Sequence, residues 1–325
     1  MQLIKSLDEL HIKDRTAVAL GNFDGIHIGH QKIMENALES AKDKDLKALC
    51  FTFSNHPFNF ILGRDEKDPA AVKLICSEEE KISIIRDMGF DILVNVPFDE
   101  RIMKMKAHDF FEDVLIGRLN AGCISVGFNY SYGARAEGKP EMLKAECAAS
   151  GTDCIVHDAV TLDGSVISST LIRGTISEGN MELVSRFLGR PYTVSGRVEH
   201  GNRIGSTQGY PTANIPFPEE RMAPPNGVHF THTVIDGTEY ESVSNLGSKP
   251  TIDSSNRTRS IETYLFGFNG DLYGRDITVR FDHFSRPEVK FGSKDELFEQ
   301  ISRDCAGALE YHRKTLNAPA TYADA

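Results

Sequence analysis

Short apolar runs recur through the first half of the chain. Each run has the length of a strand and ends in turn residues, a pattern typical of buried β-strands. The runs cover residues 17–23, 46–53, 91–98 and 123–128. We therefore expect several strands whose two faces are both covered.

Between these runs, apolar residues recur at helical spacing. The residues with this period are Ile33, Met34, Ala37, Leu38 and Ala41. Ser77 and Glu80 form a capping box that predicts a helix through Met88, and residues 107–119 form another amphipathic segment. Alternating strands and helices predict an α/β domain with a parallel sheet covered on both faces. Ligands of such sheets bind at the carboxyl ends of the strands.

The pattern changes after residues 189–191. From 192 to 284, short β-type runs are separated by Gly, Asn, Asp and Pro, and the sequence IDGT at 235–238 predicts a tight hairpin. This spacing predicts a small antiparallel barrel. A helix is then expected from about 293 to 314, with an apolar face made of Leu297, Phe298, Ile301, Cys305 and Leu309. We therefore expect two domains, 1–188 and 189–325.

The composition excludes some classes of protein. With 40% hydrophobic and 26% charged residues, each half can bury a core, which excludes disordered and collagen-like chains. The net charge of −11 disfavours sequence-independent binding to nucleic acid. No apolar stretch is long enough for a membrane span and the amino-terminal residues are too charged for a secretory signal, so we expect a cytoplasmic protein. The six cysteines lack zinc spacing and are expected to be reduced, mostly buried thiols.

The sharpest chemical signal lies between the first predicted strand and the first predicted helix. The sequence from Gly21 to His30 reads GNFDGIHIGH. Backbone N–H groups and the helix dipole at such a junction favour a phosphate, and Gly25 and Gly29 let the backbone approach it closely. His27 and His30 can hydrogen-bond phosphate oxygens and stabilise charge developing at phosphorus. The alternative is that both histidines only cap or pack the helix start.

Polar groups suited to a metal and a nucleotide occur in the second half. Glycines recur every four residues at Gly201, Gly205 and Gly209, and such a loop can lie against a phosphate or an aromatic ring. In the PTAN sequence that follows, Thr212 and Asn214 place a hydroxyl and an amide oxygen on one face of an extended segment. Both oxygens suit Mg²⁺, whereas a plain turn is the alternative.

Glu262 is a candidate general base. Strand alternation would place it on the same face as three aromatic residues, Tyr264, Phe266 and Phe268. A carboxylate that is partly removed from water suits a general base, whereas an exposed glutamate on an edge strand is the alternative.

The segment 21–30 resembles the HxGH signature of the nucleotidylyltransferase superfamily, in the form found in bacterial bifunctional riboflavin kinase/FAD synthetases. Further motifs resemble that family along almost the whole chain: TFSNHP at 52–57, GFNYSYG at 127–133, ISSTLIR at 167–173 and PTAN at 211–214. Asn129 and Ser131 stand where many relatives have Asp and Arg, and Leu171 replaces a common Arg.

The resemblance implies roles for individual residues. In a Rossmann-like first domain, His27 and His30 would be catalytic, and the ATP phosphates would be bound by Gly21, Phe23, Asp24, Gly25, Gly29, Ser168, Thr170 and Arg173. The flavin would be bound there by His56, Pro57 and Asn129. In a riboflavin kinase-like barrel, nucleotide and flavin would be bound by Gly205, Gly209, Thr212, Asn214, Asn245 and Arg286. Thr212 and Asn214 would hold Mg²⁺, and Glu262 would activate the riboflavin 5′-hydroxyl.

The resemblance implies a bifunctional enzyme that uses ATP twice. The barrel would phosphorylate riboflavin to FMN, and the first domain would adenylylate FMN to FAD and release pyrophosphate. Two alternatives remain open. One domain could bind flavin without turnover, or an adenylyltransferase could be fused to a nucleic-acid-binding barrel, which the net charge of −11 and the lack of an aromatic and basic stripe disfavour. The GxxxxGK match at 133–139 has Pro140 where a P-loop needs Ser or Thr, so it is interpreted as a loop closing over the site.

Overall fold

The computed structural model describes residues 1–65, 68–199, 211–250 and 257–316. The chain forms two compact units, Met1–Ser169 and Thr170–Ala325. The predicted domain boundary at 188/189 lies after the first two helices of the second unit, and it stays a prediction.

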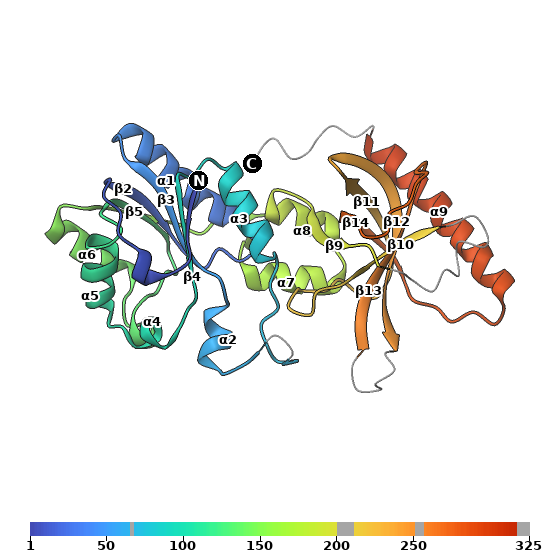
Figure 1. Ribbon diagram of the computed structural model, residues 1–325, viewed down its shortest axis with the longest axis horizontal. Coiled ribbons are helices and arrows are strands. Elements are labelled where there is room, and N and C mark those ends of the chain that lie inside the picture. Colours follow the sequence, from blue (N-terminus) through green and yellow to red (C-terminus); the bar gives the residue numbers. More distant parts are fainter. Residues whose placement is uncertain (66–67, 200–210, 251–256, 317–325) are drawn as a thin grey trace. The chain divides into compact units, whose positions relative to one another are not determined.

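A parallel six-stranded sheet forms the centre of the first unit (Figure 1). Its strands are β1 (Gln2–Ile4), β2 (Thr16–Leu20), β3 (Lys47–Phe53), β4 (Ile92–Val96), β5 (Ala121–Gly127) and β6 (Asp153–His157). The order β1-β4-β3-β2-β5-β6 places β3 on one side of β2 and β5 on the other. The chain therefore reverses its direction of winding at β2 and β5, and the carboxyl ends of these two strands form the expected ligand site.

Short helices connect these strands. The helical segments are η1 (Leu7–Glu9), α1 (Ile28–Asp43), α2 (Pro57–Ile61), α3 (Glu78–Asp87), α4 (Glu100–Lys104), α5 (Ala107–Asp109), η2 (Phe110–Ile116), η3 (Ala134–Ala136) and α6 (Pro140–Ser150). A small antiparallel pair, β7 (Thr161–Leu162) and β8 (Ser165–Val166), precedes the end of the unit.

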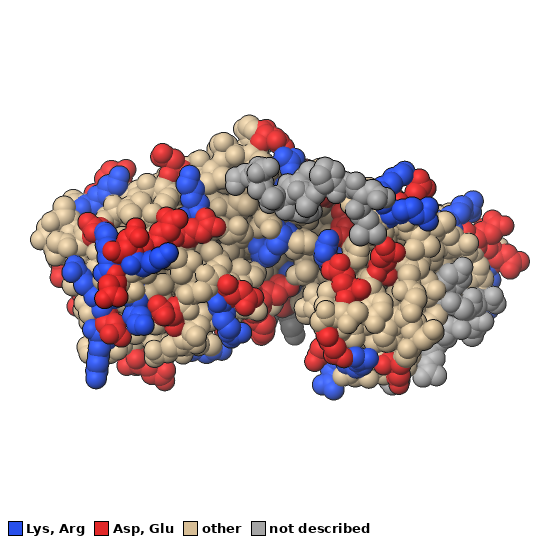
Figure 2. All heavy atoms as spheres, turned by 90° about the horizontal axis from the view of Figure 1, so that it is seen from above, with Lys and Arg blue, Asp and Glu red and all other residues tan. Residues whose placement is uncertain are grey.

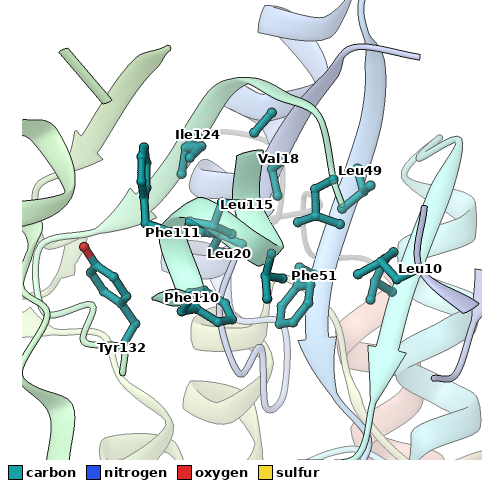
Figure 3. Close-up of a cluster of buried hydrophobic side chains, with 14 of the residues drawn as sticks. Leu10, Val18, Leu20, Leu49, Phe51, Phe110, Phe111, Leu115, Ile124 and Tyr132 are labelled. Carbon is teal, nitrogen blue, oxygen red and sulfur yellow. The ribbon is translucent and has the colours of Figure 1, made fainter. Parts of the chain in front are cut away.

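Alternate residues of the strands enter two hydrophobic cores, one on each face of the sheet. In β2, Val18 and Leu20 join a core that includes Phe110 of η2 (Figure 3). Ala17 and Ala19 belong instead to the core that includes buried residues of α1. Because a core covers each face of the sheet, β2 is buried at every position. Its uninterrupted apolar pattern predicts this burial.

Two predicted helices have different outcomes. The capping box is confirmed: the Ser77 hydroxyl accepts a hydrogen bond from the Glu80 backbone, and the Glu80 carboxylate accepts one from the Ser77 backbone. The amphipathic segment predicted over 107–119 is helical from Ala107 to Ile116, but α5 is followed directly by the π-helix η2, which the pattern did not predict. The wider π turn brings two adjacent pairs, Phe110–Phe111 and Val114–Leu115, into the core together.

The second unit begins with two helices, α7 (Ser169–Glu178) and α8 (Met181–Leu188), of which α7 starts at the unit boundary. α8 packs on strands β9 and β14 of the sheet that follows. It ends at Gly189, whose φ of 66° is the left-handed conformation that glycine adopts readily at a helix end.

An antiparallel six-stranded sheet follows, with the order β10-β13-β12-β11-β14-β9. Its strands are β9 (Tyr192–Arg197), β10 (Thr212–Pro216), β11 (Gly227–Ile235), β12 (Thr238–Pro250), β13 (Arg257–Leu265) and β14 (Asp276–Pro287). The predicted hairpin is confirmed, since Ile235 pairs with Thr238 and the turn residues Asp236 and Gly237 have φ of 47° and 78°. A bridge between Glu199 and Asn214 joins the two ends of this curled sheet.

The last described helix, α9 (Lys294–Leu316), buries most of the predicted face, since Cys305 is buried and Ile301 packs against the same cluster, but Leu309 is an exception. Leu309 is 37% exposed, whereas Ala308 and His312 are fully buried. Asp304 is buried as well, because it pairs with Arg286 of β14. The polar side chains of Asp304 and His312 therefore also belong to the buried face of α9. Apolar periodicity alone could not identify these two residues.

The structure confirms the expectation for the cysteines. All six cysteines are free, and all except Cys154 are buried, as predicted. In the described ranges, no helix has the length and apolar character required to cross a membrane.

Candidate active sites

The turn after β2 holds both imidazole rings of the predicted phosphate site. His27 is the N-cap of α1, and its Nδ1 accepts a hydrogen bond from the backbone N–H of His30 at 3.2 Å. The two rings stack, with centroids 3.6 Å apart. Because Nδ1 of His27 is an acceptor, the proton of its neutral ring lies on Nε2, which can donate to a phosphate oxygen. Capping and phosphate binding by His27 are therefore compatible.

The backbone of this turn is strained. Phe23 and Ile26 have φ of 48° and 39°, in the left-handed region that side chains with a Cβ rarely adopt. Both side chains are fully buried. The Phe23 ring also packs edge-on against His30, with centroids 5.3 Å apart. Strain of this kind is typical of functional turns. Here the strained residue Phe23 packs against the ring of His30, which is predicted to be catalytic.

The glycines of the turn leave no room for larger residues. Gly25 has φ of 82°, and a Cβ there would lie 2.8 Å from the Ile75 side chain. A Cβ on Gly29 would lie 3.2 Å from Nδ1 of His27. At Gly21 it would lie 2.7 Å from the Phe23 ring. Gly21 and Gly25 therefore have no room for a Cβ, whereas at Gly29 the His27 ring would have to shift by a few tenths of an ångström.

Asp24 ties this turn to two other segments of the first unit. Its carboxylate accepts a hydrogen bond from the Ile75 backbone at 2.9 Å, and its carbonyl accepts one from the Ser169 hydroxyl at 3.0 Å. The residue is only 4% exposed. The structure thus shows a positioning role for Asp24, and its predicted contact with a phosphate stays a prediction.

The ISST sequence at 167–170 lies at the start of a helix, as predicted. Ser168 directly precedes α7, which begins at Ser169. Thr170 follows in the first turn and Arg173 lies about one turn later. The contacts of Ser168, Thr170 and Arg173 with a polyphosphate stay predictions.

The predicted flavin residues follow two other strands of the parallel sheet. His56 comes after β3 and caps α2, where its Nδ1 accepts a hydrogen bond from the Phe58 backbone at 3.3 Å. Pro57 is the first residue of α2. Asn129 comes after β5, close to Gly127. Because parallel strands end at the same edge, the turns after β2, β3 and β5 share one edge of the sheet.

Exposed apolar side chains occur on the same segments, and the sequence analysis missed them. They are Phe58, Phe60, Ile61 and Leu62 on or next to α2 and Phe128 after β5, each 39–53% exposed. Apolar surface beside predicted flavin residues suits a planar aromatic ligand. The signal in the sequence was the apolar run that directly follows Pro57.

In the second unit, Glu262 lies at the centre of a polar row across three strands. In β13 it pairs with Asn214 of β10 on one side and with Asn245 of β12 on the other. Directly opposed residues of an antiparallel pair point to the same face of the sheet. The sequence predicted all three residues as site residues, and the sheet register brings them together.

The aromatic face expected beside Glu262 is shorter than predicted. Tyr264 lies one step along β13, opposite Thr212. The strand ends at Leu265, but Phe266 still packs edge-on against Tyr264, and both rings contact the same buried cluster. Phe268 instead packs edge-on against Tyr240, which lies on β12.

A pocket of about 580 Å³ opens beside Glu262 and Asn245 of this row, whereas Asn214 is not among its walls. Its walls include Thr212, Asn245, Glu262, Tyr264 and Arg286, together with Leu297, Ile301, Asp304 and Cys305 of α9 and apolar residues of the sheet. This volume lies within the range of ordinary small-molecule sites. α9 therefore forms one wall of a site whose other wall is the predicted kinase row.

Arg286 is held by α9. Its Nε and one terminal nitrogen donate to the two carboxylate oxygens of Asp304 at 2.9 and 2.6 Å. A second terminal nitrogen donates to the Pro287 carbonyl, and Gln300 donates to Asp304. The predicted ligand contact of Arg286 stays a prediction, whereas its role in fastening α9 beside the pocket is visible.

The oxygen groups around the row have the chemistry that Mg²⁺ prefers. Thr212 supplies a hydroxyl, Asn214 an amide and Glu262 a carboxylate, and all three are hard oxygen donors. The Asn214 amide nitrogen lies 3.5 Å from the Thr212 carbonyl, and the amide oxygen is the atom of this side chain that could bind a cation. Gly205 and Gly209 of the predicted glycine loop lie outside the described residues.

Comparisons with known proteins match the two parts of the chain to two families. A family model described as FAD synthetase matches residues 9–171, and one described as riboflavin kinase matches residues 188–312. A bifunctional riboflavin kinase/FMN adenylyltransferase of Bacillus subtilis is 35% identical over 91% of this chain and 92% of that protein. Its counterpart from Escherichia coli K12 is 31% identical over 96% of this chain and 98% of that protein.

A solved structure has the same fold over nearly the whole chain. It is a Streptococcus pneumoniae protein described as a macrolide-efflux protein, with a TM-score of 0.84, 29% identity, and coverage of 93% of this chain and 96% of that one. The family itself is decided by the two family models and the sequence relatives. They confirm the resemblance seen in the motifs: this chain belongs to the bifunctional riboflavin kinase/FMN adenylyltransferase family.

Proposed function

We propose that this chain converts riboflavin to FMN in its second unit and FMN to FAD in its first unit, with ATP as the donor in both reactions. The observation that carries the proposal is that the motif residues converge in two separate places, each within one unit. One is the stacked pair His27 and His30, and the other is the row of Asn214, Glu262 and Asn245.

In the kinase reaction, Glu262 takes the proton of the riboflavin 5′-hydroxyl. The hydroxyl oxygen then bonds to the γ-phosphorus of ATP, and ADP leaves with the electron pair of the broken P–O bond. The pocket of about 580 Å³ beside Glu262 supports this assignment, because it can hold a substrate against the carboxylate. Asn245 and Tyr264 on the same wall would orient the flavin.

Magnesium would be held in this unit by Thr212 and Asn214. When bound, it neutralises charge on the ATP phosphates. The oxygen donors beside Glu262 support this placement. Asn214→Ala should therefore raise the Mg²⁺ concentration needed for half-maximal riboflavin phosphorylation, whereas it should leave FAD formation from FMN unchanged.

In the adenylyl transfer, a phosphate oxygen of FMN bonds to the α-phosphorus of ATP, and pyrophosphate leaves. Nε2 of His27 and the neighbouring ring of His30 would donate hydrogen bonds to the phosphate oxygens that gain negative charge in the transition state. Within the same unit, the Ser168 hydroxyl would donate to the polyphosphate. Neither reaction needs a covalent intermediate with the protein, because positioned donors suffice for in-line transfer.

Incubation with riboflavin, ATP and Mg²⁺, followed by separation of FMN and FAD, tests the proposal. Wild-type protein should form both products. His30→Ala should lower the rate of FAD formation by about 10²-fold and accumulate FMN. Glu262→Gln should lower riboflavin phosphorylation by about 10²–10⁴-fold and still convert supplied FMN to FAD.

Each variant is the control for the other, since each should lose one activity and keep the other. Formation of FMN alone by the wild type would favour the alternative in which one domain only binds flavin. Loss of both activities in either variant would indicate misfolding rather than a catalytic role.

The nucleic-acid-binding alternative has less support. On the face drawn in Figure 2, Lys and Arg are interspersed with Asp and Glu and form no continuous basic surface among the described residues. Such a surface is the usual requirement for binding a phosphate backbone. A filter-binding assay with single-stranded oligonucleotides should show no retention at physiological salt. We also expect the protein to act in the cytoplasm.

A further inference from the structure

Three metal-ligating side chains meet outside both candidate active sites. His232 of β11, Asp282 of β14 and His312 of α9 each offer a ligand atom within 4.8 Å of the other two. The His232 and His312 rings lie 4.5 Å apart, and Nδ1 of His232 lies 2.7 Å from the Asp282 carboxylate. None of these residues lines the pocket beside Glu262.

His312 is arranged like a metal ligand. It is fully buried, and its Nε2 lies 3.3 Å from the Ser242 carbonyl, to which it can donate. Its other nitrogen, Nδ1, is buried and has no hydrogen-bond partner among the described residues. Histidines that bind metals commonly donate one ring N–H to a carbonyl and use the other nitrogen as the ligand. A buried nitrogen without any partner would destabilise the fold by roughly 1–3 kcal/mol.

The surroundings of the cluster favour a cation. Asp282 is fixed through its Oδ1 by Nε of Arg280 at 2.9 Å, and its Oδ2 is the oxygen beside His232. Glu239 lies 4.0 Å from Nε2 of His232 and also contacts Arg280. Glu241 stands opposite His232 in the strand pairing. Three carboxylates therefore lie around one guanidinium, and a divalent cation would offset this excess of negative charge.

We propose that His232, Asp282 and His312 bind one divalent transition-metal ion of the Zn²⁺ type. Two imidazoles and one carboxylate form a common Zn²⁺ ligand set, with a fourth position left for water. Magnesium is disfavoured, since it prefers oxygen ligands and retains its water. The site is therefore chemically distinct from the oxygen donors beside Glu262.

A metal ion here would fasten α9 to the sheet. Its ligands come from β11, β14 and the carboxyl-terminal part of α9. The same helix carries Asp304, which holds Arg286 beside the pocket. The metal would thus restrain the helix that forms one wall of the proposed kinase site, and it would slow amide hydrogen exchange in that helix.

Calorimetric titration of the full chain with ZnCl₂, in buffer that contains millimolar Mg²⁺, tests the proposal. The wild type should bind one Zn²⁺ per chain with micromolar or tighter affinity. His232→Gln and Asp282→Asn should each weaken this binding by about 100-fold or more, since even residues that only orient ligands change affinity by roughly 10–100-fold. The matched control is His283→Gln. That histidine is next to Asp282 in sequence but bonds to Glu182, so its variant should bind Zn²⁺ like the wild type.

Titration of the wild type with Co²⁺ keeps the test independent of any misfolded variant. We expect the visible absorption of four-coordinate Co²⁺ with nitrogen and oxygen ligands, and its loss when Zn²⁺ is added. Hydrogen exchange in α9 should slow with Zn²⁺ in the wild type and not in Asp282→Asn. Thiolate charge-transfer bands, unchanged Zn²⁺ affinity in both variants, or no binding would each overturn the proposal. In the last case a water molecule would be the partner of His312.

Discussion

The two roles of His27, as helix cap and as phosphate donor, can be separated by a pair of substitutions. His27→Ala removes both the ring and the acceptor for the His30 backbone N–H. His27→Asn removes the ring but keeps a side-chain acceptor at the N-cap, where asparagine is among the preferred residues. If His27 serves only as a cap, the Asn variant should behave like the wild type in every assay.

The expected changes in stability and in rate follow from the lost capping hydrogen bond and the lost Nε2 donor. Loss of an N-cap acceptor costs about 0.5–2 kcal/mol of stability. A change of 1 kcal/mol shifts the melting temperature of a domain of this size by roughly 2–4 °C. His27→Ala should therefore melt several degrees below the wild type, and His27→Asn close to it. Both should lower FAD formation from FMN by about 10²-fold, because each lacks the Nε2 donor.

Calorimetric melting and the rate of FAD formation from supplied FMN decide between the roles. Riboflavin phosphorylation by the same preparations is the control for protein quality, and it should be unchanged in both variants. An Asn variant that formed FAD at the wild-type rate would refute the donor role. Equal melting temperatures for the Ala variant and the wild type would refute the capping role.

The remaining predictions concern the second unit. A fragment of residues 170–325 should melt at a higher temperature than one of residues 189–325, because α8 packs on β9 and β14; equal melting would contradict this. Burial lowers the pKa of His229 from 6.5 to about 4, so the folded state disfavours its proton. The contribution of neutral His229 to the free energy of unfolding should therefore be fully present above about pH 6.5 and decrease by roughly 3 kcal/mol toward pH 4. Urea titrations of His229→Gln should show a free energy of unfolding that depends less on pH. Asp304→Asn should cost about 3 kcal/mol of unfolding free energy and raise the riboflavin KM. Glu310→Gln, which breaks an exposed pair with Lys314 on α9, should leave the melting temperature nearly unchanged.

The central strands were predictable because burial on both faces produces uninterrupted apolar runs. β2, β3, β4 and β5 follow that pattern. The edge strands β1 and β6 were missed because one has only three residues and the other is at most half-buried. The π-helix η2 was missed because its hydrogen bonding depends on packing by adjacent aromatic residues, which an amphipathic pattern does not report.

The candidate sites were predictable as residue types but not as arrangements. Motifs identified Asn214, Glu262 and Asn245, whereas their common row follows from strand register over distant segments. Asp304 and His312 could not be assigned from the helical period, because each polar residue is buried by a partner from another element. Long-range pairing of polar groups is therefore the information that the sequence pattern lacked.

The strained turn after β2 limits how far this catalytic segment can be transplanted. Left-handed backbone at a residue with a Cβ costs on the order of 1–2 kcal/mol, and an isolated peptide has nothing to offset that cost. Here the full burial of Phe23 and Ile26 in the core offsets it. A graft of residues 21–30 onto a foreign scaffold would therefore relax and separate the two rings unless the surrounding core were copied with it.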